Sequence, residues 1–92
     1  MTLSYPKGSI FRRALERWGE ANQIEMLEEE MAELTVAIHH FYRSRADRSN
    51  VIEELADVQI VLHQMIYIFG VDDFEKKYSE KIIRLEEKLS DL

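Results

Sequence analysis

Apolar side chains recur at helical spacing through most of this chain. The clearest set has successive members three or four positions apart: Ile24, Leu27, Met31, Leu34, Ile38 and Phe41. Residues at this spacing gather on one side of an α-helix, whereas a half-buried strand needs apolar and polar residues in strict alternation. No segment of the sequence shows that alternation. The pattern therefore predicts an all-α fold.

Turn and cap signals set the limits of the first two predicted helices. Residues 1–8 are predicted to form an N-terminal arm, because the segment ends in a Pro-Lys-Gly turn signal. Ser9 is an N-cap candidate for a first helix that Gly19 ends. The second helix carries the apolar set described above. We expect it to be the longest of the fold.

The second half of the chain contains two more predicted helices. Residues 43–50 are polar, lack an apolar stripe and predict a loop, with Ser49 or Asn50 as the next N-cap. The third helix is rich in apolar residues and ends at Gly70, and the fourth begins at Asp72. We expect a four-helix bundle in which the second and third helices are antiparallel, because a short loop joins them.

Size and composition narrow the class of protein. A chain of 92 residues forms a single domain, here residues 1–92, with a core modest enough that a homodimer or homotetramer is expected. The net charge of −6 argues against nucleic acid or an anionic membrane as partner. The absence of cysteine excludes disulfides, zinc–thiolate sites and thiol nucleophiles. With neither a signal-peptide pattern nor a long apolar run, we expect a cytoplasmic protein.

Two pairs of acids stand out against this background. Glu30 and Glu33 are three positions apart, as are Glu54 and Asp57, so each pair lies on one side of its helix. Glu54 falls inside the apolar arc of the third helix, and Glu30 borders the apolar stripe of the second. An ionised carboxylate among apolar residues is costly unless a cation, a donor or a proton compensates it. We predict one group of four carboxylates between two facing helices.

The composition of this group points to a hard cation. Carboxylate oxygens without histidine or cysteine suit Mg²⁺, with Mn²⁺ as the alternative. A di-iron site in a helical bundle needs a Glu-x-x-His motif on two helices. None of the three histidines has an acid three positions earlier. The sequence therefore favours a magnesium site.

The order of these motifs resembles a known family. The resemblance spans residues 10–85 and lies in Trp18-Gly19, then Gln23, then Glu29-Glu30-x-x-Glu33-Leu34, then Glu54-x-x-Asp57-Val58 in an apolar helix that ends at Phe69-Gly70. This arrangement is similar to the MazG-like all-α nucleoside triphosphate pyrophosphatases, whose motif is Glu-Glu-x-x-Glu, a spacer and Glu-x-x-Asp.

The resemblance implies a reaction and its metal ligands. The reaction is hydrolysis of a nucleoside or deoxynucleoside triphosphate to the monophosphate and pyrophosphate, in the house-cleaning of a nucleotide pool. Glu30, Glu33, Glu54 and Asp57 match the Mg²⁺ ligands of the family. Glu29 matches a further motif acid, which would hold another metal ion or orient the attacking water.

The resemblance also implies substrate contacts. Trp18 and Gln23 match positions near the nucleobase, although Trp18 could instead fill the top of the core and Gln23 could lie on the surface. Lys81 and Arg84 match basic positions that reach phosphates, or they belong to a solvated face. Two other functions stay open: a non-catalytic helical interaction module, and a sensor that binds nucleotide without turnover.

Overall fold

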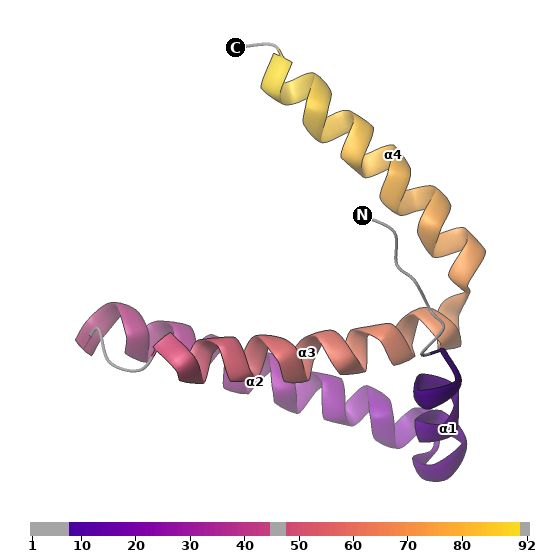
Figure 1. The fold of residues 1–92 in the computed structure, drawn as a ribbon, viewed down its shortest axis with the longest axis horizontal. Coiled ribbons are helices and arrows are strands. Elements are labelled where there is room, and N and C mark those ends of the chain that lie inside the picture. The colour runs from indigo at the N-terminus through magenta and orange to yellow at the C-terminus, as the bar shows by residue number, and fades with distance from the viewer. Residues whose placement is uncertain (1–7, 45–47, 91–92) are drawn as a thin grey trace.

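The computed structural model of the chain describes residues 8–44 and 48–90. These residues form four helices, α1 (Gly8–Trp18), α2 (Glu20–Ser44), α3 (Arg48–Phe69) and α4 (Val71–Ser90), and no strand occurs among them (Figure 1). The predicted all-α, four-helix fold is confirmed. Most of the predicted N-terminal arm, residues 1–7, and residues 45–47 of the predicted loop lie outside the described residues.

A single glycine forms the junction at two of the three places where one helix follows another. Gly19 stands between α1 and α2 with a φ of 87°, and Gly70 stands between α3 and α4 with a φ of 122°. Residues with a Cβ rarely adopt such positive φ values, which explains the residue type at both positions. The amide of Gly19 donates to the carbonyl of Leu15 at 2.8 Å, and that of Gly70 donates to Ile66 at 2.9 Å. The two predicted stops are confirmed.

The predicted caps are wrong by a few residues. Ser9, Ser49 and Asn50 all lie inside helices, because α1 begins at Gly8 and α3 begins at Arg48. Residues 43–44 and 48–50 of the loop predicted over residues 43–50 are therefore helical. Arginine and serine are tolerated in helices, so a polar run without an apolar stripe does not by itself end one.

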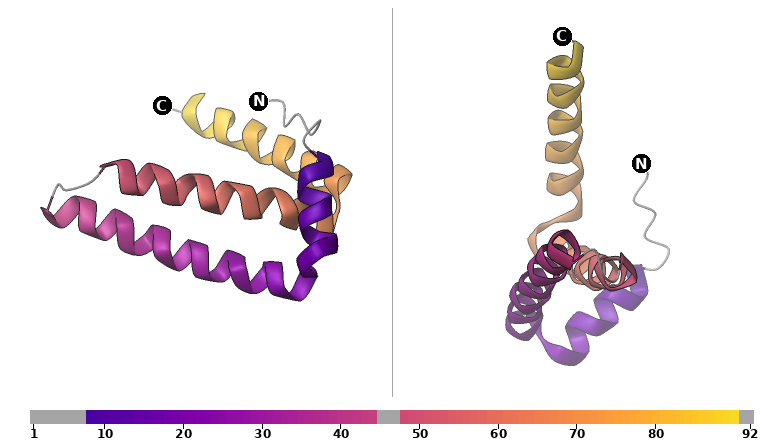
Figure 2. Two further views of the ribbon diagram at one scale, coloured as in Figure 1. Left: turned by 60° about the horizontal axis from the view of Figure 1, so that its bottom comes forward. Right: turned by 90° about the vertical axis from the view of Figure 1, so that its left-hand side faces the viewer.

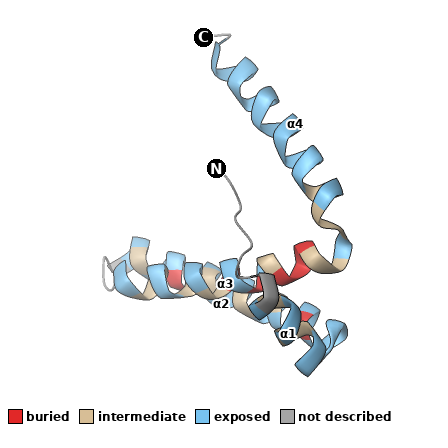
Figure 3. Cartoon of the chain, turned by 45° about the vertical axis from the view of Figure 1, so that its right-hand side comes forward, coloured by how far each residue is buried: buried red, intermediate tan, exposed pale blue. Residues whose placement is uncertain are grey.

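The antiparallel pair α2–α3 is the centre of the fold. The two helices lie side by side along their length, and α1 crosses their end near the Gly19 junction (Figure 2). The buried apolar residues are Ala37 from α2 and Val58, Val61, Met65 and Ile66 from α3. Most of this core belongs to the half of α3 on which α1 also packs (Figure 3).

The face that α2 turns towards α3 differs from the predicted stripe. Ile24, Met31 and Ile38 are 38%, 51% and 37% exposed, whereas Gln23 and Ala37 are buried. The contact face therefore follows Gln23, Leu27, Glu30, Leu34, Ala37 and Phe41. The small side chain of alanine permits close approach of the two helices, and a buried glutamine is tolerated where it finds a hydrogen-bond partner. Glu30 is thus on the contact face rather than at its border.

The fourth helix diverges from the other three. Among the helices that the structure describes, α4 packs only against α3, and none of its residues is buried (Figures 1 and 3). The radius of gyration is 15.9 Å. A compact chain of this length would have a radius of about 12 Å. None of the described helices is long and apolar enough to span a membrane.

Candidate metal centre

Three carboxylates meet between α2 and α3. Glu30 and Glu33 come from successive turns of α2, and Glu54 comes from the facing turn of α3. One carboxylate oxygen from each of the three lies within 4.8 Å of the others. The i, i+3 spacing places the α2 pair on one side of its helix, and the antiparallel packing brings Glu54 across to it. The structure therefore brings together three of the four predicted ligands.

Two of these carboxylates carry an oxygen that no donor satisfies. Glu30 Oε2 and Glu54 Oε2 are buried, and neither has a hydrogen-bond partner among the described residues. Buried polar atoms in native proteins are normally paired, because leaving them unpaired costs free energy. Both atoms lie in the seam between the helices. A cation bound between the helices would compensate the cost of burying these two oxygens.

Burial and like charges disfavour ionisation at the same place. Burial is the main cause of a raised pKa at Glu30, and the charges of Glu33, Asp57 and Glu29 raise it further. Burial also raises the pKa of Glu54, followed by the charges of Glu33, Asp57 and Glu30 and a hydrogen bond with Glu33. Without a cation the group therefore favours extra protons. A divalent cation would reverse that preference by stabilising the charged forms.

The other two motif acids lie next to this group. Asp57 is half-buried one turn beyond Glu54 and lies outside the group of three, but its charge acts on both Glu30 and Glu54. Glu29 is exposed, and its charge acts on Glu30. Asp57 therefore lies close enough to influence the charges of the group without belonging to it. Glu29 lies on the solvent-exposed side of the same group.

Gln23 is part of a buried amide pair. Its Nε2 donates to Gln64 Oε1 at 2.5 Å, its Oε1 accepts from Asn22 Nδ2 at 3.3 Å, and Gln23 and Gln64 are 2% and 4% exposed. Gln23 therefore contacts α3 and does not lie on the surface. We did not predict a role for Gln64 from the sequence. Gln64 could have been identified in the same way as Glu54, because both are polar residues among the apolar residues of α3.

The remaining predicted substrate contacts are exposed. Trp18 is 57% exposed at the end of α1, so it does not fill the top of the core. Lys81 and Arg84 are exposed on α4. Among the described helices α4 makes no packing contact with α2, which carries Glu30 and Glu33. Within one chain the structure does not bring these two basic residues to the carboxylates.

The fold and this group define a class of protein: an all-α domain with an acidic site, suited to a hard cation, between its two longest helices. The model of the MazG nucleotide pyrophosphohydrolase domain matches residues 19–90, which is most of the chain. The chain therefore belongs to the MazG family, and the matched region contains all five motif acids. No curated protein and no solved structure gives a significant match to the chain.

Proposed function

We propose that this chain is a Mg²⁺-dependent nucleoside triphosphate pyrophosphohydrolase, and that Glu30, Glu33, Glu54 and Asp57 hold the metal, with Mn²⁺ as a substitute. The observation that carries the proposal is the pair of buried, unpartnered oxygens, Glu30 Oε2 and Glu54 Oε2, inside a three-carboxylate group. Membership of the MazG family supports the choice of nucleotide as substrate. An oxygen-only donor set fits Mg²⁺, which combines a few carboxylates with substrate phosphates and water.

The reaction consumes one water. The water oxygen bonds to the α-phosphorus and its proton passes to the solvent. The bond from that phosphorus to the bridging oxygen breaks, and the products are the nucleoside monophosphate and pyrophosphate. A bound divalent cation supplies charge neutralisation on the phosphates and a lowered pKa for a coordinated water. Glu29 is exposed beside the group. It is therefore our candidate for accepting a hydrogen bond from the attacking water and orienting it.

Of the residues predicted to contact the substrate, three are exposed and Gln23 is buried. Trp18 presents an exposed aromatic face on which a nucleobase can stack. Gln23 acts by holding α2 against α3 through Gln64, on the contact face that also carries Glu30. Lys81 and Arg84 reach the phosphates only when an α4 helix, from this chain or another, closes over the carboxylates. The role that fits this chemistry is the clearance of unwanted nucleotides from a cytoplasmic pool.

A substrate panel tests the proposal. The full chain is incubated with ribo- and deoxyribonucleoside triphosphates, ordinary and modified, and pyrophosphate release is measured with Mg²⁺ and with EDTA. Glu54→Gln removes a charge of the group at nearly constant volume. Glu53→Gln is the matched control, since the adjacent Glu53 is exposed and outside the group.

The outcomes separate the proposal from its rivals. We expect turnover by the wild type and by Glu53→Gln in Mg²⁺, and a loss of turnover in EDTA and in folded Glu54→Gln. Full activity in Glu54→Gln would refute the assignment. Calorimetric nucleotide binding without any product would identify a sensor. Neither binding nor turnover across the panel would indicate a helical interaction module.

A further inference from the structure

Two aromatic contacts fasten α1 to α3. Phe11 stacks on His63, with ring centroids 4.8 Å apart and planes inclined by 13°. At the next position of α1, the guanidinium carbon of Arg12 lies 5.6 Å from the centroid of the Tyr67 ring. Stacked rings, and a cation over a ring face, attract each other beyond the gain from burial alone. The beginning of α1 is therefore held on two successive turns of α3.

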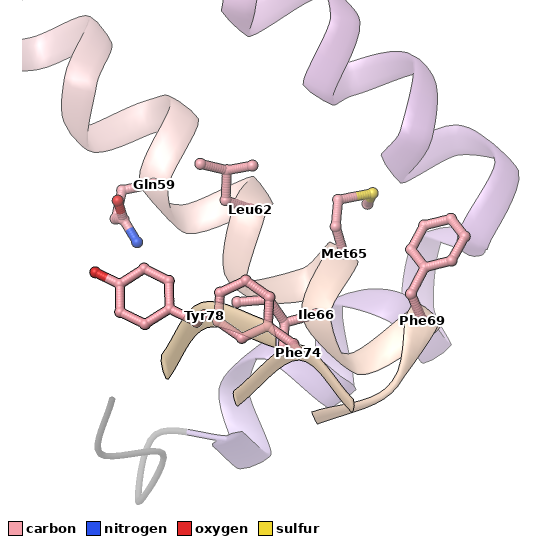
Figure 4. Close-up of a pocket in the computed structure, with 7 residues that line it drawn as sticks. All are labelled: Gln59, Leu62, Met65, Ile66, Phe69, Phe74 and Tyr78. Atoms are coloured by element: carbon pink, nitrogen blue, oxygen red, sulfur yellow. The ribbon is translucent and has the colours of Figure 1, made fainter. Parts of the chain in front are cut away.

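The His63 ring is also held from within α3. Gln59 Nε2 lies 3.2 Å from His63 Nε2. Gln59 is one turn earlier on α3 and lines an apolar hollow of about 350 Å³ between α3 and α4, beside Tyr78 (Figure 4). Burial lowers the pKa of His63, so the neutral ring, which can accept from the Gln59 amide, prevails at pH 7. The ring on which Phe11 stacks thus has a defined orientation.

Two contacts in different directions oppose rotation of α1 about its own axis. Successive residues of a helix are about 100° apart, so Phe11 and Arg12 leave α1 on different sides. The junction with α2 is the single residue Gly19, and a Cβ added there would meet nothing within 4 Å. The junction therefore packs no side chain that could fix the rotation. The two ring contacts help to set the direction in which each side of α1 faces.

Trp18 shares the side of α1 that Phe11 occupies. The two residues are seven positions apart, which places them about 20° apart round the helix and roughly 10 Å apart along it. Phe11 is half-buried against α3, whereas Trp18 is 57% exposed. Trp18 thus extends the same aromatic side beyond the contact with His63. Any rotation of α1 turns Trp18 by the same angle.

This aromatic side of α1 is the one nearer the carboxylates. The helix α1 crosses the end of the α2–α3 pair (Figure 2). Phe11 meets His63, which is about 9 Å along α3 from Asp57, whereas Arg12 meets Tyr67, which is about 15 Å from it. Phe11 therefore marks the side of α1 that is turned towards the acidic group, and Trp18 lies on that side.

We propose that Phe11 and His63 are positioning residues for the nucleoside part of the substrate, because their stack holds α1 at the rotation in which Trp18 receives the nucleobase. The inference rests on the proposed function, in which Trp18 is the base contact. Neither Phe11 nor His63 touches the substrate. The metal and the phosphates bind to the α2–α3 pair, so their binding does not depend on this stack.

Steady-state kinetics test the proposal on the full chain. Pyrophosphate release from the four common deoxyribonucleoside triphosphates is measured in Mg²⁺. His63→Ala should raise KM by about 5- to 100-fold, the range for one lost base–aromatic stack, and change kcat by no more than about twofold. The Ki of inorganic triphosphate, which has no base, should not change. His63→Phe keeps a ring and should keep the wild-type KM. His39→Ala, at an exposed position of α2, is the matched control.

A double-mutant cycle separates positioning from a merely structural effect. Trp18→Ala should raise KM by a similar factor, and adding His63→Ala to it should raise KM no further, because the effect passes through Trp18. Phe11→Leu removes the stack from the α1 side at little cost in apolar volume. It makes the same test if His63→Ala does not fold, which circular dichroism shows.

The outcomes distinguish this inference from the proposed hydrolysis. A KM within about twofold of the wild type in folded Phe11→Leu or His63→Ala would overturn the positioning role alone. A matching rise in the Ki of inorganic triphosphate, or multiplied effects in the double variant, would do the same. A wild type that turns over no nucleotide would refute the hydrolysis and this role with it.

Discussion

Replacing Gln64 by leucine tests whether the buried amide pair fixes the contact between α2 and α3. The change removes the oxygen that accepts from Gln23 Nε2 at 2.5 Å. Gln23 is only 2% exposed, so water has little access to the donor that is left behind. An unsatisfied buried donor costs about 1–3 kcal/mol. For a domain of this size, each kcal/mol lowers the Tm by about 4–8 °C, so a 2 kcal/mol loss corresponds to about 8–16 °C.

A double-mutant cycle isolates the hydrogen bond from other effects. Gln23→Leu should cost a similar amount to Gln64→Leu, whereas the double variant replaces both polar groups by apolar ones and should lose less than the sum. Unfolding is followed by far-ultraviolet circular dichroism at one fixed chain concentration, because association adds to apparent stability. Additive effects, or single variants within about 0.5 kcal/mol of the wild type, would refute this account of the seam.

Three further predictions concern the same pair of helices. First, the raised pKa values of Glu30 and Glu54 mean that the folded chain binds more protons than the unfolded chain. In EDTA the Tm should therefore fall as the pH rises from the ordinary pKa of 4.5 through the raised values, and it should fall less steeply in Glu54→Gln. A Tm that rises over this pH range would contradict the prediction. Second, Mg²⁺ at 100 times its Kd should stabilise the folded wild type by about 2.7 kcal/mol. Glu33→Gln should lose most of this stabilisation. Glu28→Gln should keep it, because Glu28 is exposed and lies outside the group of three carboxylates. Third, Ala37→Leu should cost about 1–3 kcal/mol by overpacking the seam, whereas Val36→Leu, at a 52% exposed position, should be close to neutral in urea unfolding.

Local signals predicted the helices well. Gly19 and Gly70 end α1 and α3 as expected, because a positive φ is a property of a single residue and needs no knowledge of the rest of the fold. The gathering of Glu30, Glu33 and Glu54 also followed from local spacing plus one assumption, that α2 and α3 face each other. Their roles as metal ligands remain a prediction.

Features that depend on distant partners were not visible in the sequence. The apolar stripe through Ile24, Met31 and Ile38 placed the centre of the α2 contact face wrongly, because apolarity could not show that Gln23 meets Gln64, 41 residues away. The direction in which α4 leaves α3 could not be predicted from the sequence either. The apolar stripe of α4 predicts that this helix packs against apolar residues, but it does not show that α3 is the one described helix it contacts.

Phosphorus-31 NMR of a nucleoside triphosphate incubated with the full chain and Mg²⁺ tests the proposed pyrophosphohydrolase activity, because it shows which phosphate bond breaks. We expect the triphosphate signals to be replaced by those of the nucleoside monophosphate and pyrophosphate in equal amounts. Release of the diphosphate and inorganic phosphate, or triphosphates unchanged across the whole substrate panel, would contradict it.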